Sequence, residues 1–202
     1  MKKLNYFNMG FRDMLPITTG VIPFGAVVGS IYSEAQMTSL QSIGMNILVF
    51  AGASQLAAVE LMTKHAAASV VIVTALIINL RFLLYSAAIS PVVHKSSFLV
   101  KLTAAYLLTD QSYAIMSASE NKLPNNTEAV RYYFGTSVCM LLVWHLSVAA
   151  GFIFGNFAPA SWALEFAVPL SFIALVIPTL KNRNYLYVAL FSSVVSILLY
   201  SL

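Results

Sequence analysis

Long runs without a charged side chain dominate this sequence, and a few isolated charges separate them. No charged residue occurs between Asp13 and Glu34 or between Glu34 and Glu60, and residues 132–164 and 184–202 contain none. A helix that crosses the hydrocarbon core of a bilayer needs about 20 mostly apolar residues. Each run is long enough for one crossing, so the sequence predicts a membrane protein with several spans.

The composition indicates the same solvent. Apolar residues make up 59% of the chain and charged residues 9%, whereas a soluble domain has about 25% charged residues. So few charges cannot cover a soluble domain of 202 residues. This argues against a cytosolic enzyme, a nucleic-acid-binding domain and a disordered chain. The only cysteine, Cys139, excludes a disulfide framework within the chain.

We predict an all-α polytopic membrane helix bundle that forms one integral membrane permease domain over residues 1–202. An outer-membrane barrel is excluded because the apolar runs lack the alternating pattern of its strands. The first run lacks the features of a cleaved signal peptide, and we expect it to stay in the membrane. The seven expected spans lie near residues 13–33, 41–63, 66–90, 98–118, 132–155, 161–180 and 184–201.

The distribution of Lys and Arg predicts the orientation, because cytoplasmic loops are enriched in these residues. Placing the N-terminus in the cytoplasm gives eight basic residues inside and two outside, and the opposite orientation reverses this bias. The inner group is Lys2, Lys3, Arg12, Lys64, Lys122, Arg131, Lys181 and Arg183, and the outer group is Lys95 and Lys101. A re-entrant segment in place of a span would change this count.

The first expected span is rich in residues that interrupt helices, namely Pro16, Gly20, Pro23, Gly25 and Gly29. Proline removes a backbone donor and clashes with the preceding turn. Transporters use broken helices to direct half-helix N-termini at anionic substrate groups. We therefore predict a broken first helix. The alternative is a proline kink with a GxxxG packing surface.

The second expected span contains VFAGASQLAA, in which Gly52 and Ser54 are small and Gln55 brings an amide into the membrane. Small residues allow a neighbouring backbone to come close. Gln55 has two equally supported interpretations. It either joins two helices by a hydrogen bond of about 1 kcal/mol or lines a polar path.

Two opposite charges lie inside the third and fourth expected spans. Arg81 lies in NLRFLLYSAAISP and Asp110 in LLTDQSYA. A central arginine costs about 2.5–3.5 kcal/mol even on the mildest insertion scale. Because consecutive spans are antiparallel and the depths are similar, we expect the two residues to pair. The pair is either structural or part of a substrate path.

Polar side chains around this pair favour the path. Tyr106, Asp110, Tyr113 and Ser117 are at helical spacing and form one polar stripe on the fourth expected span. The candidate substrate-binding residues are Pro23, Phe24, Gly25, Gly52, Ser54, Gln55, Asn79, Arg81, Tyr85, Tyr106, Asp110 and Tyr113.

The other ionisable groups and motifs are less informative about function. His145 beside Trp144 is interpreted as a packed histidine rather than a proton carrier, and Glu60 with Lys64 as an interfacial ion pair. The sequence contains no GxxxxGK[ST], HExxH or GxSxG motif and no Cys/His cluster. We therefore expect no cofactor, no metal site and no enzyme activity.

Five segments in order carry a family resemblance: PFGAVVG, VFAGASQLAA, NLRFLLYSAAISP, LLTDQSYA and EFAVPLSFIALVIP. Together they resemble the AzlC family, the large subunit of branched-chain amino acid exporters, from about Phe11 to Pro178. The resemblance implies efflux of leucine, isoleucine, valine and similar amino acids across the bacterial inner membrane. It also implies a small membrane partner of the AzlD type.

The expected function is therefore ion-gradient-driven export of branched-chain amino acids, with protons as the first candidate for the coupling ion. The lipid bilayer is the other partner, and nucleic acid is not one. The alternative is a membrane-embedded structural or regulatory subunit without its own path. Two departures from the family pattern bear on coupling: Phe82 replaces a common histidine, and Gln111 replaces a common glutamate.

Overall fold

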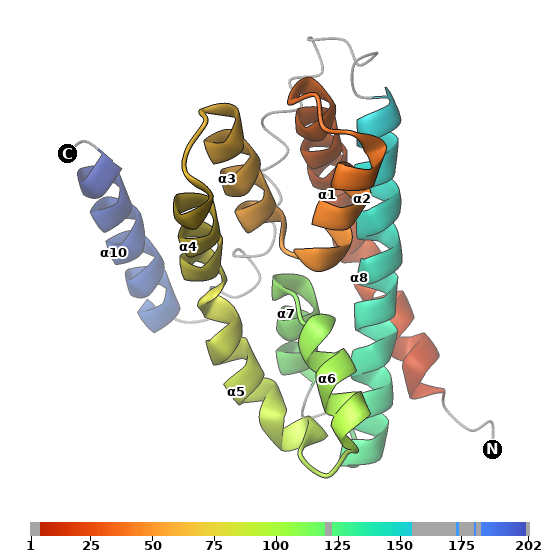
Figure 1. Ribbon diagram of the computed structural model, residues 1–202. Helices are drawn as coiled ribbons and strands as arrows, with labels where there is room; N and C mark the ends of the chain where they lie inside the picture. Colours follow the sequence, from red (N-terminus) through yellow and green to blue (C-terminus); the bar gives the residue numbers. More distant parts are fainter. Residues whose placement is uncertain (1–4, 120–122, 155–172, 174–179, 181–182, 201–202) are drawn as a thin grey trace.

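The computed structural model describes residues 5–119, 123–154, 173, 180 and 183–200, and every regular element named in these residues is an α-helix. The chain begins at what we call the lower end, and the opposite end is the upper end (Figure 1). The helices are α1 (Tyr6–Glu34), α2 (Ser39–Leu48), α3 (Gly52–Thr63), α4 (Ala68–Asn79), α5 (Arg81–Val93), α6 (Phe98–Tyr106), α7 (Asp110–Ser119), α8 (Asn126–Phe154) and α10 (Arg183–Tyr200).

Three of the described helical segments are long and apolar enough to cross a membrane. They are α1, the segment Ala68–Val93 formed by α4 and α5, and α8. These match the first, third and fifth expected spans. α10 overlaps the expected span 184–201 and is apolar but shorter. The expected span 161–180 lies outside the described residues apart from 173 and 180, so the structure does not confirm seven spans.

The predicted break in the first helix is wrong, because α1 is continuous for 29 residues with Pro16 and Pro23 inside it. A proline removes only one hydrogen bond of the helix, whereas a break inside lipid would leave several backbone groups unpaired. A continuous helix is therefore the less costly arrangement. Packing against α8 supports α1 on both sides of the prolines.

Glycines bring α1 and α8 into backbone contact. A Cβ atom at Gly29 would collide with the carbonyl oxygen of Val148, and one at Gly151 with that of Ala26. Gly10 and Gly135 make the same kind of contact nearer the lower end. The packing interpretation of GxxxG is therefore confirmed for α1. Gly155, the second glycine of the other GxxxG, lies outside the described residues.

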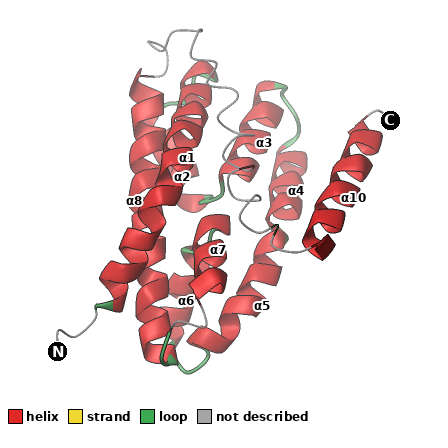
Figure 2. Cartoon of the chain, turned by 180° about the vertical axis from the view of Figure 1, so that it is seen from behind, coloured by secondary structure: helices red, strands yellow, loops and turns green. Residues whose placement is uncertain are grey.

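The breaks occur in the second and fourth expected spans instead. α2 descends from the upper end to mid-height, turns at residues 49–51, and returns as α3 to the same end (Figure 1). α6 rises from the lower end, turns at residues 107–109, and returns as α7. We call these pairs the upper hairpin and the lower hairpin. The view from behind shows the same two hairpins (Figure 2).

The hairpin tips are buried in protein. Phe50, Ala51, Leu107, Leu108 and Thr109 are each at most 8% exposed. Non-helical backbone at membrane depth is tolerated only where protein or a wet cavity surrounds it. Burial of the tips therefore makes the two re-entrant turns physically acceptable.

The two hairpins have an inverted relationship. The first span, α1, ends at the upper end and is followed by the upper hairpin, whereas α4 and α5 end at the lower end and are followed by the lower hairpin (Figure 1). Transporters commonly contain such inverted repeats, with the substrate site between them near the midplane.

Different helices form the core and the exposed apolar surface. The largest buried side chains include Trp144, Tyr132 and Tyr133 of α8 and Met14 and Tyr32 of α1. None of the residues of α4 is buried, and α10 stands beyond it at the edge of the bundle in both views (Figures 1 and 2). The core thus lies around α1 and α8, where the hairpin tips also pack.

Candidate functional site

A pocket lies where the two hairpin tips meet. Its cavity is small, with an accessible volume of about 20 Å³, which is room for about one water molecule. Residues of the upper tip, the lower tip, α1, α5 and α8 line it. The described lining residues are Phe24, Phe50, Ala51, Gly52, Ala53, Arg81, Phe82, Thr109, Asp110, Gln111, Met140 and Trp144.

Two half-helices begin at this pocket. α3 starts at Gly52, and its N-cap residue Ala51 makes no side-chain capping bond. α7 starts at Asp110 after Thr109, whose Oγ1 accepts a hydrogen bond from the backbone N–H of Ser112 at 3.2 Å. The first N–H groups of a helix lack partners in the helix and carry partial positive charge. The start of α3 is therefore suited to an anionic group, whereas the first turn of α7 already holds the carboxylate of Asp110.

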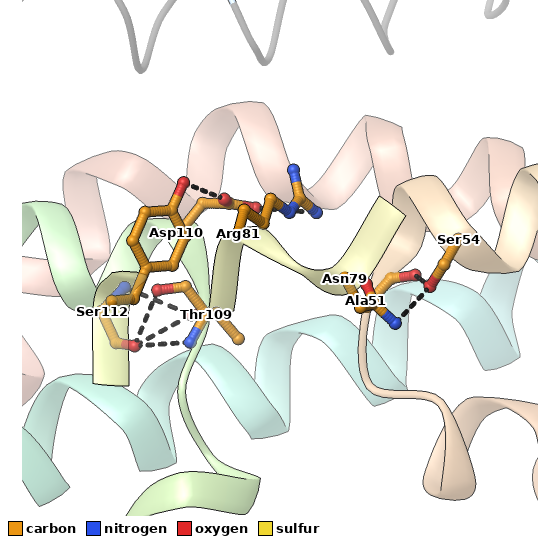
Figure 3. A network of polar contacts seen from close by, with 8 residues as sticks. Ala51, Ser54, Asn79, Arg81, Thr109, Asp110 and Ser112 are labelled. Carbon is orange, nitrogen blue, oxygen red and sulfur yellow. Dashed lines mark hydrogen bonds and ion pairs between the residues drawn. The ribbon is translucent and has the colours of Figure 1, made fainter. Parts of the chain in front are cut away.

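Arg81 and Asp110 form an ion pair across the pocket, as the sequence predicted. Arg81 Nη2 lies 3.2 Å from Asp110 Oδ2, and the hydroxyl of Tyr85 donates to Asp110 Oδ1 at 2.9 Å. Figure 3 shows this network, with Thr109 and Ser112 beneath it. The ring of Tyr113 stacks on Tyr85 with 4.4 Å between the ring centroids. Both carboxylate oxygens of Asp110 are thus contacted by side chains of α5.

The pair is partly accessible, and Arg81 retains a free donor. The side chains of Arg81 and Asp110 are 25% and 19% exposed. Arg81 Nε is buried and has no hydrogen-bond partner among the described residues. A guanidinium has five N–H donors and binds a carboxylate best through two of them. Arg81 therefore has unused capacity for a second acceptor.

A second polar network supports the upper tip. Trp144 Nε1 donates to Asn46 Oδ1 at 2.8 Å, and Gln55 Nε2 donates to the same oxygen at 3.3 Å and to the carbonyl of Val49. Because an indole N–H can only donate, this network fixes the orientation of both amides. Gln55 is completely buried. Gln55 thus joins α3 to α2 within the second expected span, while its Oε1 has no partner among the described residues.

Ser54 links this tip to the third span. Its Oγ donates to the carbonyl of Ala51 at 2.9 Å and accepts from Asn79 Nδ2 at 3.1 Å. Figure 3 shows this link between α3 and the end of α4. Asn79 precedes Arg81 by two residues. The contact therefore fixes the backbone that carries Arg81 relative to the first turn of α3.

Four of the twelve predicted site residues line the pocket: Phe24, Gly52, Arg81 and Asp110. Ser54, Gln55, Asn79, Tyr85 and Tyr113 lie behind this lining and contact it through the networks above. Pro23, Gly25 and Tyr106 are absent from the described lining. Gly25 instead packs on α8, where an added Cβ would lie 2.7 Å from Ser147 Cβ.

The predicted polar stripe is wrong at Tyr106. α6 ends at Tyr106 and α7 begins at Asp110, so the two residues do not share a helix face. The hydroxyl of Tyr106 donates to the carbonyl of Ile47 in α2 at 2.9 Å. Tyr106 thus ties the lower hairpin to the upper one instead of extending the polar surface around Asp110.

Eight lining residues were missed because most are apolar or lie in the hairpin turns. They are Phe50, Ala51, Ala53, Phe82, Thr109, Gln111, Met140 and Trp144. Thr109 could have been predicted from the sequence, because a Thr directly before an Asp is typical of the start of a helix. Phe82 and Gln111 are the two departures from the family pattern, and both fall in this pocket.

Two of the weaker candidates lie away from the pocket lining. His145 Nδ1 lies 2.9 Å from the carbonyl of Leu141, and its ring packs on Phe50 with 5.4 Å between centroids. The packed interpretation of His145 is therefore supported. Glu60 and Lys64 form the expected ion pair at 2.6 Å near the upper end of α3.

Comparison with known proteins identifies the family. The family model described as AzlC protein matches residues 16–158, which include every described residue of the pocket. The chain belongs to the AzlC family. The resemblance is thereby confirmed for four of the five sequence segments, and the fifth, at residues 165–178, lies outside the matched range.

Three relatives of this AzlC family chain are membrane proteins by name. An uncharacterized membrane protein of Archaeoglobus fulgidus is 25% identical over 91% of this chain and 80% of its own length. One from Helicobacter pylori is 23% identical over 90% and 79%, respectively. The inner membrane protein YgaZ of Escherichia coli is 22% identical over 97% and 83%. No solved structure matches the chain.

Proposed function

We propose that this AzlC family protein is the permease subunit of a secondary transporter that exports branched-chain amino acids. The observation that carries the proposal is the meeting of two half-helix N-termini and Arg81 at one mid-height pocket. Helix N-termini and an arginine together favour a carboxylate. Every amino acid presents such a group.

The remaining wall suits an aliphatic side chain. Phe24, Phe50, Met140 and Trp144 line the pocket together with the charged residues. The rings of Phe24 and Trp144 pack edge to face with centroids 5.2 Å apart. Transfer of a branched aliphatic side chain to such a surface is favourable by about 0.8 kcal/mol per buried CH₂ group. This wall supports leucine, isoleucine and valine over polar amino acids.

The inverted hairpins support transport over a passive role. Each hairpin reaches the pocket from a different end of the bundle (Figure 1), so movement of either hairpin would open the pocket toward one side. Alternating access in transporters with inverted repeats works through such relative motion around a fixed site. A non-transporting subunit needs no charged pocket at mid-height, and burying charge there is costly.

The basic residues support a cytoplasmic N-terminus in a bacterial inner membrane. With two re-entrant hairpins, the lower end holds Arg12, Lys95, Lys101 and Arg131, whereas Lys64 lies at the upper end. This bias follows the positive-inside rule. Relative to the seven-span prediction, Lys64 moves to the outer side and Lys95 and Lys101 move to the inner side, and the predicted orientation stays the same.

The proposal includes two further components that follow from the family resemblance. One is a small membrane partner of the AzlD type. The other is an ion gradient, with protons as the coupling ion.

Transport of labelled leucine by proteoliposomes tests the proposal. The protein is reconstituted with and without its co-expressed small partner, and uptake is measured with and without an imposed pH gradient. We expect gradient-dependent accumulation of leucine that requires the partner. Substitution Gly52→Leu should abolish it, because a Cβ there already lies 2.8 Å from Phe24 Cζ and the side chain would fill the pocket.

Gly44→Leu is the matched control, since a Cβ at Gly44 meets no heavy atom within 4 Å. Both variants replace a glycine of the upper hairpin with the same residue. Equal leucine transport by the two variants would place the substrate path elsewhere. Absence of leucine transport in every arm would contradict the proposed function.

A further inference from the structure

The ion pair of Arg81 and Asp110 joins the third span to the lower hairpin, two elements of the same inverted unit. Arg81 is the first residue of α5 in the third span, and Asp110 is the first residue of α7 in the lower hairpin. Both line the pocket. Any ligand that enters between them must therefore replace the interaction that each makes with the other.

The local contacts show which parts of the pair are fixed. Tyr85 on α5 holds Asp110 Oδ1 at 2.9 Å, while Oδ2 faces Arg81 Nη2 at the longer distance of 3.2 Å. Charge-assisted bonds of this type are commonly about 2.7–2.9 Å long. The Arg81–Asp110 contact is longer than this, and Arg81 Nε has no hydrogen-bond partner among the described residues. Arg81 therefore keeps unused donor capacity beside Asp110.

Charge balance then selects the ligand. The pair is neutral as a whole, so an inserted anion would leave Asp110 unpaired and an inserted cation would leave Arg81 unpaired. An unpaired charge at membrane depth is strongly unfavourable. A ligand with one positive and one negative group at short separation leaves neither charge unpaired.

We propose that the substrate is recognised as a zwitterion that inserts between the two residues. Its α-carboxylate binds the guanidinium of Arg81 and the free N–H groups of α3, and its α-ammonium binds Oδ2 of Asp110. One internal ion pair is exchanged for two ion pairs with the ligand. Asp110 is then the counter-ion of the substrate rather than a structural partner of Arg81. This inference rests on the proposed function and specifies its recognition chemistry.

A panel of three ligands with the same branched carbon skeleton tests the proposal. Leucine has both charges, 4-methyl-2-oxopentanoate lacks the ammonium group, and 3-methylbutylamine lacks the carboxylate. Binding to the purified protein with its partner is measured by competition with labelled leucine. We expect wild-type protein to bind leucine at least about tenfold more tightly than either analogue, since each analogue strands one charge.

Neutral variants of the pair should change the preference in opposite directions. Asp110→Asn leaves Arg81 as the only charge, so its preference should move from leucine toward the oxo acid. Arg81→Gln leaves Asp110 as the only charge, so its preference should move toward the amine. Glu60→Gln is the matched control, because it neutralises one member of the exposed Glu60–Lys64 ion pair away from the pocket and should keep the wild-type order of the three ligands.

The outcomes test zwitterion recognition and the proposed function separately. Wild-type protein that binds the oxo acid as tightly as leucine would overturn zwitterion recognition, and this comparison needs no variant to fold. Equal weakening of all three ligands in Asp110→Asn would also overturn it, since the pair would then act only structurally. Failure of wild-type protein to bind leucine at all would instead contradict the proposed function.

Discussion

The contribution of Arg81 and Asp110 to stability depends mainly on the charge that would be left unpaired if one of them were removed. Arg81 and Asp110 lie at membrane depth but are a quarter and a fifth exposed, so water and the pocket share in their solvation. Their pairing could be anticipated from sequence because both charges are costly in lipid. The residues that line the rest of the pocket could not, because a phenylalanine or methionine in a membrane helix is equally compatible with a lipid-facing or a pocket-facing position.

Removing either member of the ion pair should destabilise the protein, and removing both should restore much of the stability. We expect Arg81→Ala or Asp110→Ala to lower the free energy of unfolding by about 1–3 kcal/mol, below the value for a fully buried pair because water reaches both side chains. The double variant should recover folded protein but remain unable to export leucine. Thermal unfolding and leucine transport of all four proteins measure the two effects.

Independent and additive losses in the single variants would contradict this prediction, because contacting residues couple. Recovery of leucine export in the double variant would show that the pair is only structural. The two readouts are therefore both needed.

Gly29 offers a contrasting residue-level prediction. A side chain there would collide with the backbone of Val148 in α8, so Gly29→Leu should separate the two helices and lower stability by about 3 kcal/mol or more. Folded protein in detergent should fall accordingly, measured by size-exclusion chromatography. Gly44→Leu, in open space, should leave the elution profile unchanged. A normal profile for Gly29→Leu would contradict the observed α1–α8 contact.

At the scale of elements, the sequence located apolar segments well but placed the interruptions wrongly. Pro16 and Pro23 suggested a broken helix, and the helix is continuous. The actual turns, at residues 49–51 and 107–109, contain no proline. Hydropathy cannot distinguish a span from two half-helices, because both are apolar throughout. Burial of the turn by other helices decides the outcome, and that is a tertiary property.

The cap of α7 gives a prediction for the lower hairpin. Thr109 Oγ1 accepts from the Ser112 N–H, and Ser112 Oγ accepts from the Thr109 N–H at 2.9 Å. Thr109→Val keeps the shape but removes the cap, so thermal stability should fall by about 1 kcal/mol and Asp110 should be less firmly positioned. Leucine binding should weaken as well, measured by competition.

Thr103→Val in α6 is the matched control. Its hydroxyl is exposed and donates to the carbonyl of Leu99 within its own helix at 2.9 Å. The substitution should change neither stability nor leucine binding appreciably. Equal behaviour of the two variants would show that the cap does not position Asp110.

At the scale of the whole molecule, the two hairpins change which loops share a side of the membrane. Each hairpin replaces one expected crossing by a re-entrant segment that enters and leaves on the same side. Because there are two hairpins, the segments after the second one lie on the sides that the seven-span topology predicts. α1 and α8 therefore run in the same direction, as Figure 1 shows and as contacts near both ends require. Asn126 at the start of α8 donates to the carbonyl of Pro91 at 3.1 Å, which places the end of α5 at the lower end.

Cysteine accessibility decides between the two topologies. The re-entrant arrangement puts residue 95 on the same side as the N-terminus and residue 64 on the opposite side, whereas seven simple spans predict the reverse. With a cytoplasmic N-terminus, an impermeant maleimide added to intact cells should label Lys64→Cys and not Lys95→Cys. Both side chains are exposed, and the native Cys139 is buried, so it contributes little background. An epitope tag at the N-terminus, tested for access in the same cells, provides the reference side. Labelling of Lys95→Cys alone, with the tag inaccessible, would mean that the second and fourth apolar segments cross the membrane, and the pocket between two hairpin tips would lose its structural basis.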